Sequence, residues 1–179
     1  MNTLQKLSVA ASTTILALGV SAGSAHAIAL TTDGTWTKFY FDASGSTATP
    51  TFQFTIDADQ LGTLDVTDAF FKGDVFEVFR DATSLGKTSV VPTSKSGTTD
   101  FPDVAFADPS YSKGSFNLGS GFYNIIIKAD SSPFGGGGSY LRATTRPVPV
   151  PGAIFGVIVA GGALIARQRK NSKAKQTVA

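Results

Sequence analysis

The chain has 179 residues, no cysteine, one histidine and a formal net charge of +2. The basic excess is confined to the two ends, because residues 28–146 hold nine lysines and arginines against thirteen acids, a net charge of −4. We expect a central part with this charge to repel nucleic acid, which excludes nucleic acid as an expected partner.

Residues 1–27 have the order of parts of a secretory signal peptide. Lys6 gives a basic start, an apolar stretch covers residues 7–20, and small residues lead to Ala25-His26-Ala27. The signal protease accepts only small side chains before its cut, so we predict cleavage after Ala27, with Ala25 and Ala27 as the recognised residues. An uncleaved anchor is the alternative.

Cleavage at this position removes the one histidine, so the mature chain has neither His nor Cys. This excludes catalysis by a serine with a histidine base, thiol catalysis and disulfide bonds. We therefore expect a fold that depends on its apolar core alone and a protein that is not an enzyme.

Residues 28–146 show the alternation of apolar and polar side chains that is typical of half-buried strands. Turn-forming stretches separate these runs and predict turns at residues 42–45, 71–74, 84–86, 108–109 and 119–121. The pattern predicts an all-β fold, an antiparallel β-sandwich that is jelly-roll-like and has about eight strands. A signal helix and a transmembrane helix are expected to flank this domain. We predict strands over residues 36–41, 52–56, 64–67, 75–79, 85–91, 114–118, 122–129 and 139–143.

Two of these strands and two loops differ from the rest. Residues 75–79 and 125–127 are apolar on both faces, which predicts central strands. Residues 92–108 are mostly polar and predict a long exposed loop, held down in its second half by Phe101, Val104 and Phe106. Residues 133–139 form a glycine-rich loop before the last strand. Binding sites often lie on long loops at one end of a sandwich.

Acidic side chains supply two candidate chemistries. Asp57 and Asp59 could act as paired acids on a glycoside, but a domain of this size seldom provides the large cleft that sugar hydrolases use. A Ca²⁺ ion needs six to eight oxygen ligands, and a calcium site is the stronger hypothesis. Solvated turn residues are the alternative interpretation of the same acids. The candidate ligands are Asp65, Asp68, Asp74, Asp103 and Asp108.

Aromatic residues give a further candidate surface. Most of the fourteen Phe fit inward strand positions. Trp and Tyr combine a flat apolar face with a polar edge, so they are the better candidates for stacking on sugars. These candidates are Trp36, Tyr40, Tyr111, Tyr123 and Tyr140.

The C-terminal segment, residues 147–170, joins a proline-rich linker, an apolar run and a basic cluster. Residues 152–166 carry no charge and reach roughly 22 Å as a helix, shorter than a bilayer core of about 30 Å. The basic side chains that follow are expected to stay cytoplasmic. The pattern predicts a transmembrane helix with residues 171–179 as a cytoplasmic tail.

This order of parts resembles the PEP-CTERM sorting signal of bacterial exosortase substrates. In that family a Pro-Glu-Pro element lies just outside the membrane and marks where a membrane-embedded transpeptidase acts. The matching positions here are Pro149, Val150 and Pro151, so the acidic residue is missing, as in cyanobacterial variants with a Val-Pro-x-Pro opening. The resemblance implies that these positions and the basic residues Arg167, Arg169 and Lys170 direct sorting. A plain C-terminal anchor that is not cut is the alternative.

The domain itself is similar to a small secreted β-sandwich that recurs among PEP-CTERM proteins. The similar segments are residues 73–79, 84–86, 114–119 and 132–135. The likeness implies the fold and no activity.

Together these patterns predict an exported surface or extracellular-matrix protein without catalytic activity. Its expected partners are the signal peptidase, an exosortase-like transpeptidase, the membrane and exopolysaccharide. The alternative is a calcium-dependent carbohydrate-binding module displayed at the cell surface.

Overall fold

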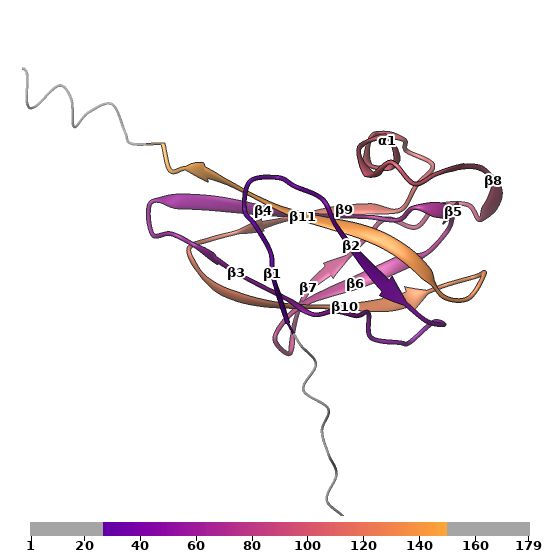
Figure 1. The fold of residues 1–179 in the computed structure, drawn as a ribbon, viewed down its shortest axis with the longest axis horizontal. Helices are drawn as coiled ribbons and strands as arrows, with labels where there is room; N and C mark the ends of the chain where they lie inside the picture. The colour runs from indigo at the N-terminus through magenta and orange to yellow at the C-terminus, as the bar shows by residue number, and fades with distance from the viewer. Residues whose placement is uncertain (1–26, 150–179) are drawn as a thin grey trace, which may run out of the picture.

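Alternating apolar residues form the buried faces of two packed β-sheets in the computed structural model, which describes residues 27–149 (Figure 1). The predicted membrane span and basic cluster lie outside these residues, as does the predicted signal peptide up to His26. Within residues 27–149, no helix has the length and apolar character that a membrane crossing requires.

The two sheets contain five and four strands. The first sheet has the order β1 (Ile28–Ala29), β3 (Phe52–Ile56), β10 (Gly121–Ser131), β6 (Val75–Arg80) and β7 (Thr83–Lys87). The second has the order β2 (Thr37–Phe41), β11 (Gly137–Pro147), β4 (Gln60–Thr67) and β9 (Lys113–Leu118). All neighbours within the two sheets are antiparallel except β1 and β3. A two-stranded ribbon, β5 (Phe70–Lys72) and β8 (Ser94–Thr99), and one short helix, α1 (Pro102–Ala107), complete the described part.

The core lies between the two sheets. Ile125 and Ile127 of β10 point inward from the first sheet, and Leu64 of β4 faces them from the second. Each buried aliphatic side chain of this kind contributes about 1.5–3 kcal/mol to folding. Phe39 of β2 meets Phe76 of β6 edge to face at 5.2 Å, which joins the sheets by an aromatic contact.

The predicted all-β sandwich is confirmed, and each of the eight predicted ranges overlaps a strand. The described residues form eleven strands rather than about eight, and nine of these lie in the two main sheets. The two doubly apolar runs lie in β6 and β10, which are neighbours inside the first sheet. The strand predicted over residues 85–91 is shorter at its end, because β7 stops at Lys87 and Val90 is 85% exposed. The jelly-roll topology stays a prediction.

The long loop predicted over residues 92–108 was wrong, because this segment forms β8 and α1. Strand β8 is polar on both faces, so no alternation indicates it, and it is held by pairing with β5. The hydroxyl of buried Tyr111 accepts a hydrogen bond from Thr99 N–H at 2.8 Å. Helix α1 begins at Pro102 and buries Ala105, whereas Phe101 and Val104 are exposed rather than held in the core.

Two turns were also placed wrongly. The segment 71–74, predicted as a turn, begins within β5. The segment 84–86 lies inside β7, where Gly86 (φ 131°) accompanies a bulge opposite β6. The chain instead reverses between β6 and β7, where Asp81 has a positive φ of 52°.

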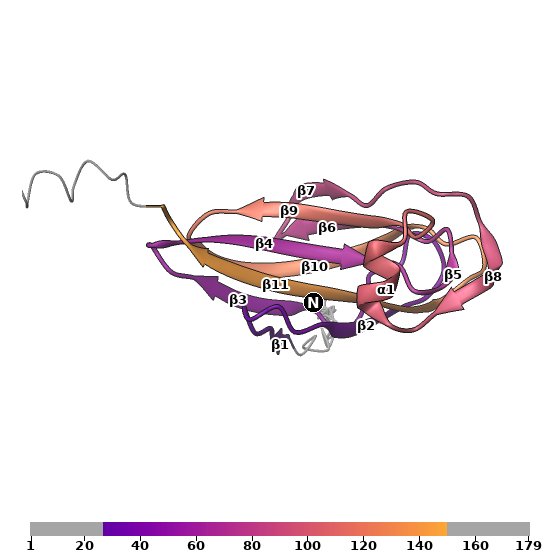
Figure 2. The same ribbon diagram turned by 90° about the horizontal axis from the view of Figure 1, so that it is seen from above.

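The sandwich has two ends, shown in Figures 1 and 2. At one end lie the β4–β5–β6 turns and the loop from β10 to β11, and we call it the glycine end. At the other end, β11 finishes beside the β3–β4 and β9–β10 turns, and we call it the tail end. Helix α1 and strand β8 lie towards the glycine end (Figure 2).

Candidate functional site

Asp68 anchors the chain at the glycine end, where β4 turns into β5 and β6. Its Oδ1 accepts a hydrogen bond from Ala69 N–H at 2.8 Å. Its Oδ2 accepts two more, from Gly73 N–H at 3.0 Å and from Asp74 N–H at 3.1 Å. Gly73 has a φ of 122°, which glycine adopts without steric cost. The buried Asp68 carboxylate therefore accepts hydrogen bonds from three backbone N–H groups that lie in the turns, outside the strands.

Asp74 lies beside this anchor and is differently placed. Its side chain is 8% exposed, and its Oδ1 is the buried side-chain atom without a hydrogen-bond partner in residues 27–149. Asp74 lines a cavity of about 160 Å³. The other lining residues belong to the β4–β5 connection, β5 and the glycine loop: Ala69, Phe70, Phe71, Phe134, Gly135, Gly136, Gly137 and Gly138.

The two carboxyl groups have raised pKa values. Burial raises the pKa of Asp68 to about 7, repulsion from Asp74 adds to the rise, and the backbone donors oppose it. Burial also raises the pKa of Asp74 to about 6, while the Ser132 hydroxyl opposes the rise. No lysine or arginine of the described chain forms an ion pair with either group. Near neutral pH, the pair thus carries negative charge without a protein counter-ion.

Aromatic rings line the cavity, and the ammonium groups of two lysines lie over these rings. Phe71 and Phe134 are 44% and 38% exposed, and their rings meet edge to face at 5.7 Å. Lys95 Nζ lies 4.8 Å from the Phe134 ring centre and 5.6 Å from that of Phe71. Lys38 Nζ lies 4.5 Å from the ring centre of Phe70. These aromatic faces already hold ammonium groups by cation–π attraction.

Two of the predicted calcium ligands, Asp65 and Asp103, share a single arginine instead. Arg142 Nε donates to Asp65 Oδ2 at 3.0 Å, and its Nη1 donates to Asp103 Oδ1 at 3.3 Å. The guanidinium stacks on Trp36 at 4.3 Å and lies 5.3 Å from the Phe106 ring centre. Trp36 Nε1 donates to Asp103 at 2.8 Å. These contacts fix helix α1 to the outer face of the second sheet.

Asp108 stands apart from the other four candidates. Its Oδ1 accepts hydrogen bonds from the Ser110 N–H and hydroxyl, which lower its pKa. Lys72 Nζ lies 3.7 Å from its Oδ2. In the part of the chain that the structure describes, no three His, Cys, Asp or Glu side chains are grouped so that they could hold a metal ion. The structure thus brings Asp68 and Asp74 together, and the calcium site stays a prediction.

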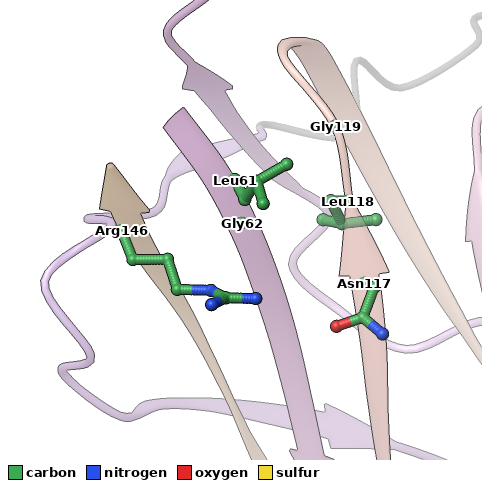
Figure 3. A pocket seen from close by; sticks show the side chains of 6 residues that line it. All are labelled: Leu61, Gly62, Asn117, Leu118, Gly119 and Arg146. Atoms are coloured by element: carbon green, nitrogen blue, oxygen red, sulfur yellow. The ribbon is translucent and has the colours of Figure 1, made fainter. Parts of the chain in front are cut away.

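A second hollow, of about 280 Å³, lies at the tail end (Figure 3). It is formed by β4, β9, the β9–β10 turn and the end of β11. The Arg146 side chain extends from β11 across β4 in the direction of Asn117 (Figure 3). Both side chains are exposed, so this hollow holds no buried charge. The residues that line it are Leu61, Gly62, Asn117, Leu118, Gly119 and Arg146.

The predicted aromatic platform is only partly at the surface. Tyr111 and Tyr123 are buried, at 1% and 3% exposure, and cannot stack on a sugar. Tyr40 is 56% exposed, whereas Trp36 and Tyr140 are half-buried. Trp36 is also engaged by Arg142. The residues named here therefore do not form one flat surface.

Most of the predicted processing residues lie outside the described part. Ala27 and Pro149 fall within it, and Pro149 is exposed. Ala25, Val150, Pro151, Arg167, Arg169 and Lys170 lie outside residues 27–149.

Sequence reasoning missed two features of the glycine end. It did not separate Asp68, which holds backbone donors, from Asp74, which holds none. It also did not place Phe71 beside Phe134, which is 63 positions later in the sequence. Two sequence features could have indicated this site. Gly73-Asp74 closely follows two phenylalanines, and a run of four glycines leads into the last strand.

Comparisons with known proteins give a distant structural likeness. No family model and no curated protein matches the chain. Among solved structures, it is similar to the pre-peptidase C-terminal domain of a collagenase from Bacillus anthracis, with 14% sequence identity and a TM-score of 0.39. The match covers 65% of this chain and 91% of that one. A likeness this distant carries no argument about fold or function.

Proposed function

We propose that the chain is an exported protein without catalytic activity, whose β-sandwich is anchored at the cell surface or delivered to the extracellular matrix by its C-terminal signal. One observation carries the proposal. Within residues 27–149, the first strand begins at Ile28, directly after the predicted cleavage position, and the last strand ends at Pro147, the first residue of the predicted sorting signal. The described strands therefore lie between the two predicted targeting segments, which supports the proposal.

The way in which the chain leaves the sandwich supports processing at this point. Arg146 and Pro147 are exposed at the end of β11. Val148 N–H donates to Asp59 O at 2.8 Å, and Pro149 beyond it is exposed. A transpeptidase would meet this segment without unfolding the domain. The proposed partners are accordingly the signal peptidase, an exosortase-like transpeptidase, the membrane and exopolysaccharide.

The absence of catalysis is proposed from the placement of the acids. Asp57 and Asp59, considered above for glycoside hydrolysis, are exposed in the β3–β4 turn and line neither cavity. Asp68 is occupied by three backbone donors.

Fractionation of cells that express the full chain or a version lacking residues 147–179 tests anchoring. We expect the full chain with membranes or the cell surface, and the truncated chain in the medium. The matched control keeps residues 147–179 and carries Asp57→Asn on the domain, and it should fractionate like the full chain. Retention of the truncated protein in the full-length fraction would show that the tail does not sort it.

Processing is tested separately, by mass spectrometry of both ends of the mature protein. We expect an N-terminus at Ile28 and a C-terminus near residues 149–151. A variant carrying both Pro149→Ala and Pro151→Ala should stay membrane-bound with its tail intact. An intact C-terminus in the unmodified protein would instead indicate a plain anchor.

The alternative function, calcium-dependent carbohydrate binding, is not proposed as a second candidate. The described structure does not gather the predicted calcium ligands, and two of the five aromatic candidates are buried. Calcium and sugar binding are instead outcomes of the experiment described below.

A further inference from the structure

Asp74 places a carboxylate at the wall of the glycine-end cavity, and no lysine or arginine of residues 27–149 forms an ion pair with it. Asp74 is more than nine-tenths buried, and its Oδ1 accepts no hydrogen bond within residues 27–149. A buried carboxylate oxygen without a hydrogen-bond partner is costly, and native proteins normally satisfy such atoms. A cation in the adjoining cavity would therefore stabilise the Asp74 carboxylate.

The neighbouring acid does not explain Asp74. The Asp68 carboxylate organises the turn by accepting three backbone hydrogen bonds, and one of these holds the backbone of Asp74 itself. The turn is thus complete without the Asp74 side chain. Its carboxylate is held at the cavity wall by the anchored backbone, so its position is fixed in advance of binding.

The glycine run keeps the space beside this carboxylate open. A Cβ atom on Gly137 would lie 3.9 Å from Asp74 Oδ2 and 3.2 Å from the Phe41 ring. At Gly136, a Cβ would come within 2.6 Å of Phe41 O. Larger side chains here would fill the cavity or push the loop away from β2.

The cavity wall suits an organic cation better than a metal ion. Ca²⁺ takes six to eight oxygen ligands, and the described residues group no three metal-binding side chains. Phe70, Phe71 and Phe134 instead present aromatic rings, which attract ammonium groups through their negative faces. Lys38 and Lys95 already place their ammonium groups over these rings, so an incoming amine competes with these two side chains and depends on the Asp74 carboxylate for its attraction.

We propose that the cavity binds a small primary ammonium group, with Asp74 as its counter-ion and the phenylalanine rings as its wall. At about 160 Å³, the cavity is smaller than the roughly 300–1,000 Å³ of sites for whole drug-sized ligands. It therefore receives one functional group of a larger molecule, such as the amine of an amino sugar or of a lysine side chain. This inference does not depend on the proposed sorting of the chain.

The test is a titration of the full chain in detergent at pH 7, followed by the amide NMR signals of residues 135–138. The probes are n-propylammonium, glucosamine and lysine amide, with N-acetylglucosamine and CaCl₂ as comparisons at matched ionic strength. We expect saturable shifts with the three amines and none with N-acetylglucosamine. The relative affinities of glucosamine and lysine amide distinguish the two sources of the amine.

Substitutions locate the binding group. Asp74→Asn should weaken n-propylammonium binding at least tenfold, because the counter-ion is lost. Asp57→Asn, which removes an exposed carboxylate at the tail end, should leave the affinity unchanged. Phe134→Leu keeps an apolar side chain at the rim but removes the aromatic face, and should weaken binding about threefold. It also tests the site if Asp74→Asn fails to fold.

Three results would overturn the proposal. The first is the absence of saturable shifts at residues 135–138 with every amine. The second is an unchanged affinity in both Asp74→Asn and Phe134→Leu. The third is saturation by CaCl₂ at lower concentration than by any amine, which would make the cavity a calcium site.

Discussion

Each end of the sandwich contains a hollow lined by glycine and a charged residue, but the charged residue is exposed at the tail end and buried at the glycine end. At the tail end, Arg146 is exposed on the last strand and lies over an open surface (Figure 3). At the glycine end, Asp74 is buried, lacks a partner for one oxygen and has a raised pKa.

The difference shows that burial, rather than the presence of a hollow, makes a charged residue a candidate for binding. Water satisfies an exposed guanidinium at little cost, so Arg146 needs no ligand. The Oδ1 atom of Asp74 is buried without a hydrogen-bond partner, and no lysine or arginine of the described residues pairs with this side chain, so a cation in the adjoining cavity would relieve a real cost. Four substitutions test this contrast.

Gly136→Ala should have the largest effect. The new Cβ would meet Phe41 O at 2.6 Å and Asp42 Cα at 2.9 Å, and these are backbone atoms that cannot rotate away. We expect the free energy of unfolding to fall by about 2–3 kcal/mol, measured by urea denaturation. Gly119→Ala at the tail end has nothing within 4 Å of its Cβ and should change it by less than about 0.5 kcal/mol. Equal effects at the two positions would mean that the glycine loop does not pack on β2 as described.

Asp68→Asn should follow, with a loss of about 2 kcal/mol at pH 7. One carboxylate oxygen is replaced by an NH₂ group, which cannot accept the hydrogen bonds from Gly73 and Asp74 N–H. Thermal and urea unfolding measure the change, with exposed Asp57→Asn as the matched control. A variant as stable as that control would contradict the anchoring role.

Asp74→Asn should change stability in the opposite direction and in a pH-dependent way. The folded-state pKa is raised from 3.8 to about 6, so the folded protein binds more protons than the unfolded chain between these values. The stability contributed by this group is therefore present below about pH 4 and is lost as the pH rises through about 6.

At pH 7 the loss reaches at most about 3 kcal/mol, since one pKa unit corresponds to about 1.4 kcal/mol. The new amide still lacks a partner, so we expect the variant to be about 1–2 kcal/mol more stable than the unmodified protein at pH 7. This gain should disappear at pH 4. Urea unfolding at pH 4, 5, 6 and 7 gives the two curves, and parallel curves would show that Asp74 titrates normally.

Arg146→Ala should have the smallest effect, less than about 0.5 kcal/mol at any of these pH values. Its side chain is exposed and forms no ion pair within residues 27–149. Urea unfolding beside Arg142→Ala gives the contrast, because Arg142 joins Asp65 and Asp103. A large loss from Arg146→Ala would mean that the tail-end hollow is a packed structural element.

Much of the sandwich could be predicted from the sequence because the alternation of side chains reports the two faces of a strand. Phe52, Phe54 and Ile56 are buried as their spacing predicts. Strand β8 could not be found in this way, since Ser94–Thr99 is polar throughout and is held by backbone pairing and by Tyr111 from a later segment. A strand without alternating apolar and polar residues cannot be recognised from this pattern.

The candidate site was predicted only in part, for a related reason. The acids Asp68 and Asp74 were identified by type, but their separate roles depend on which atoms lie around them. Phe134 reaches the site through the loop between β10 and β11, a contact between distant segments that local spacing does not encode.

Strand β11 connects both ends without interruption. Its eleven residues, Gly137–Pro147, rise about 3.4 Å each and so span roughly 35 Å. Pro147 and the glycine loop are therefore separated by the full length of this strand. If the chain is tethered to a surface through its last residues, the Asp74 cavity lies at the end of the domain away from the tether (Figures 1 and 2), where it is open to molecules in the surroundings.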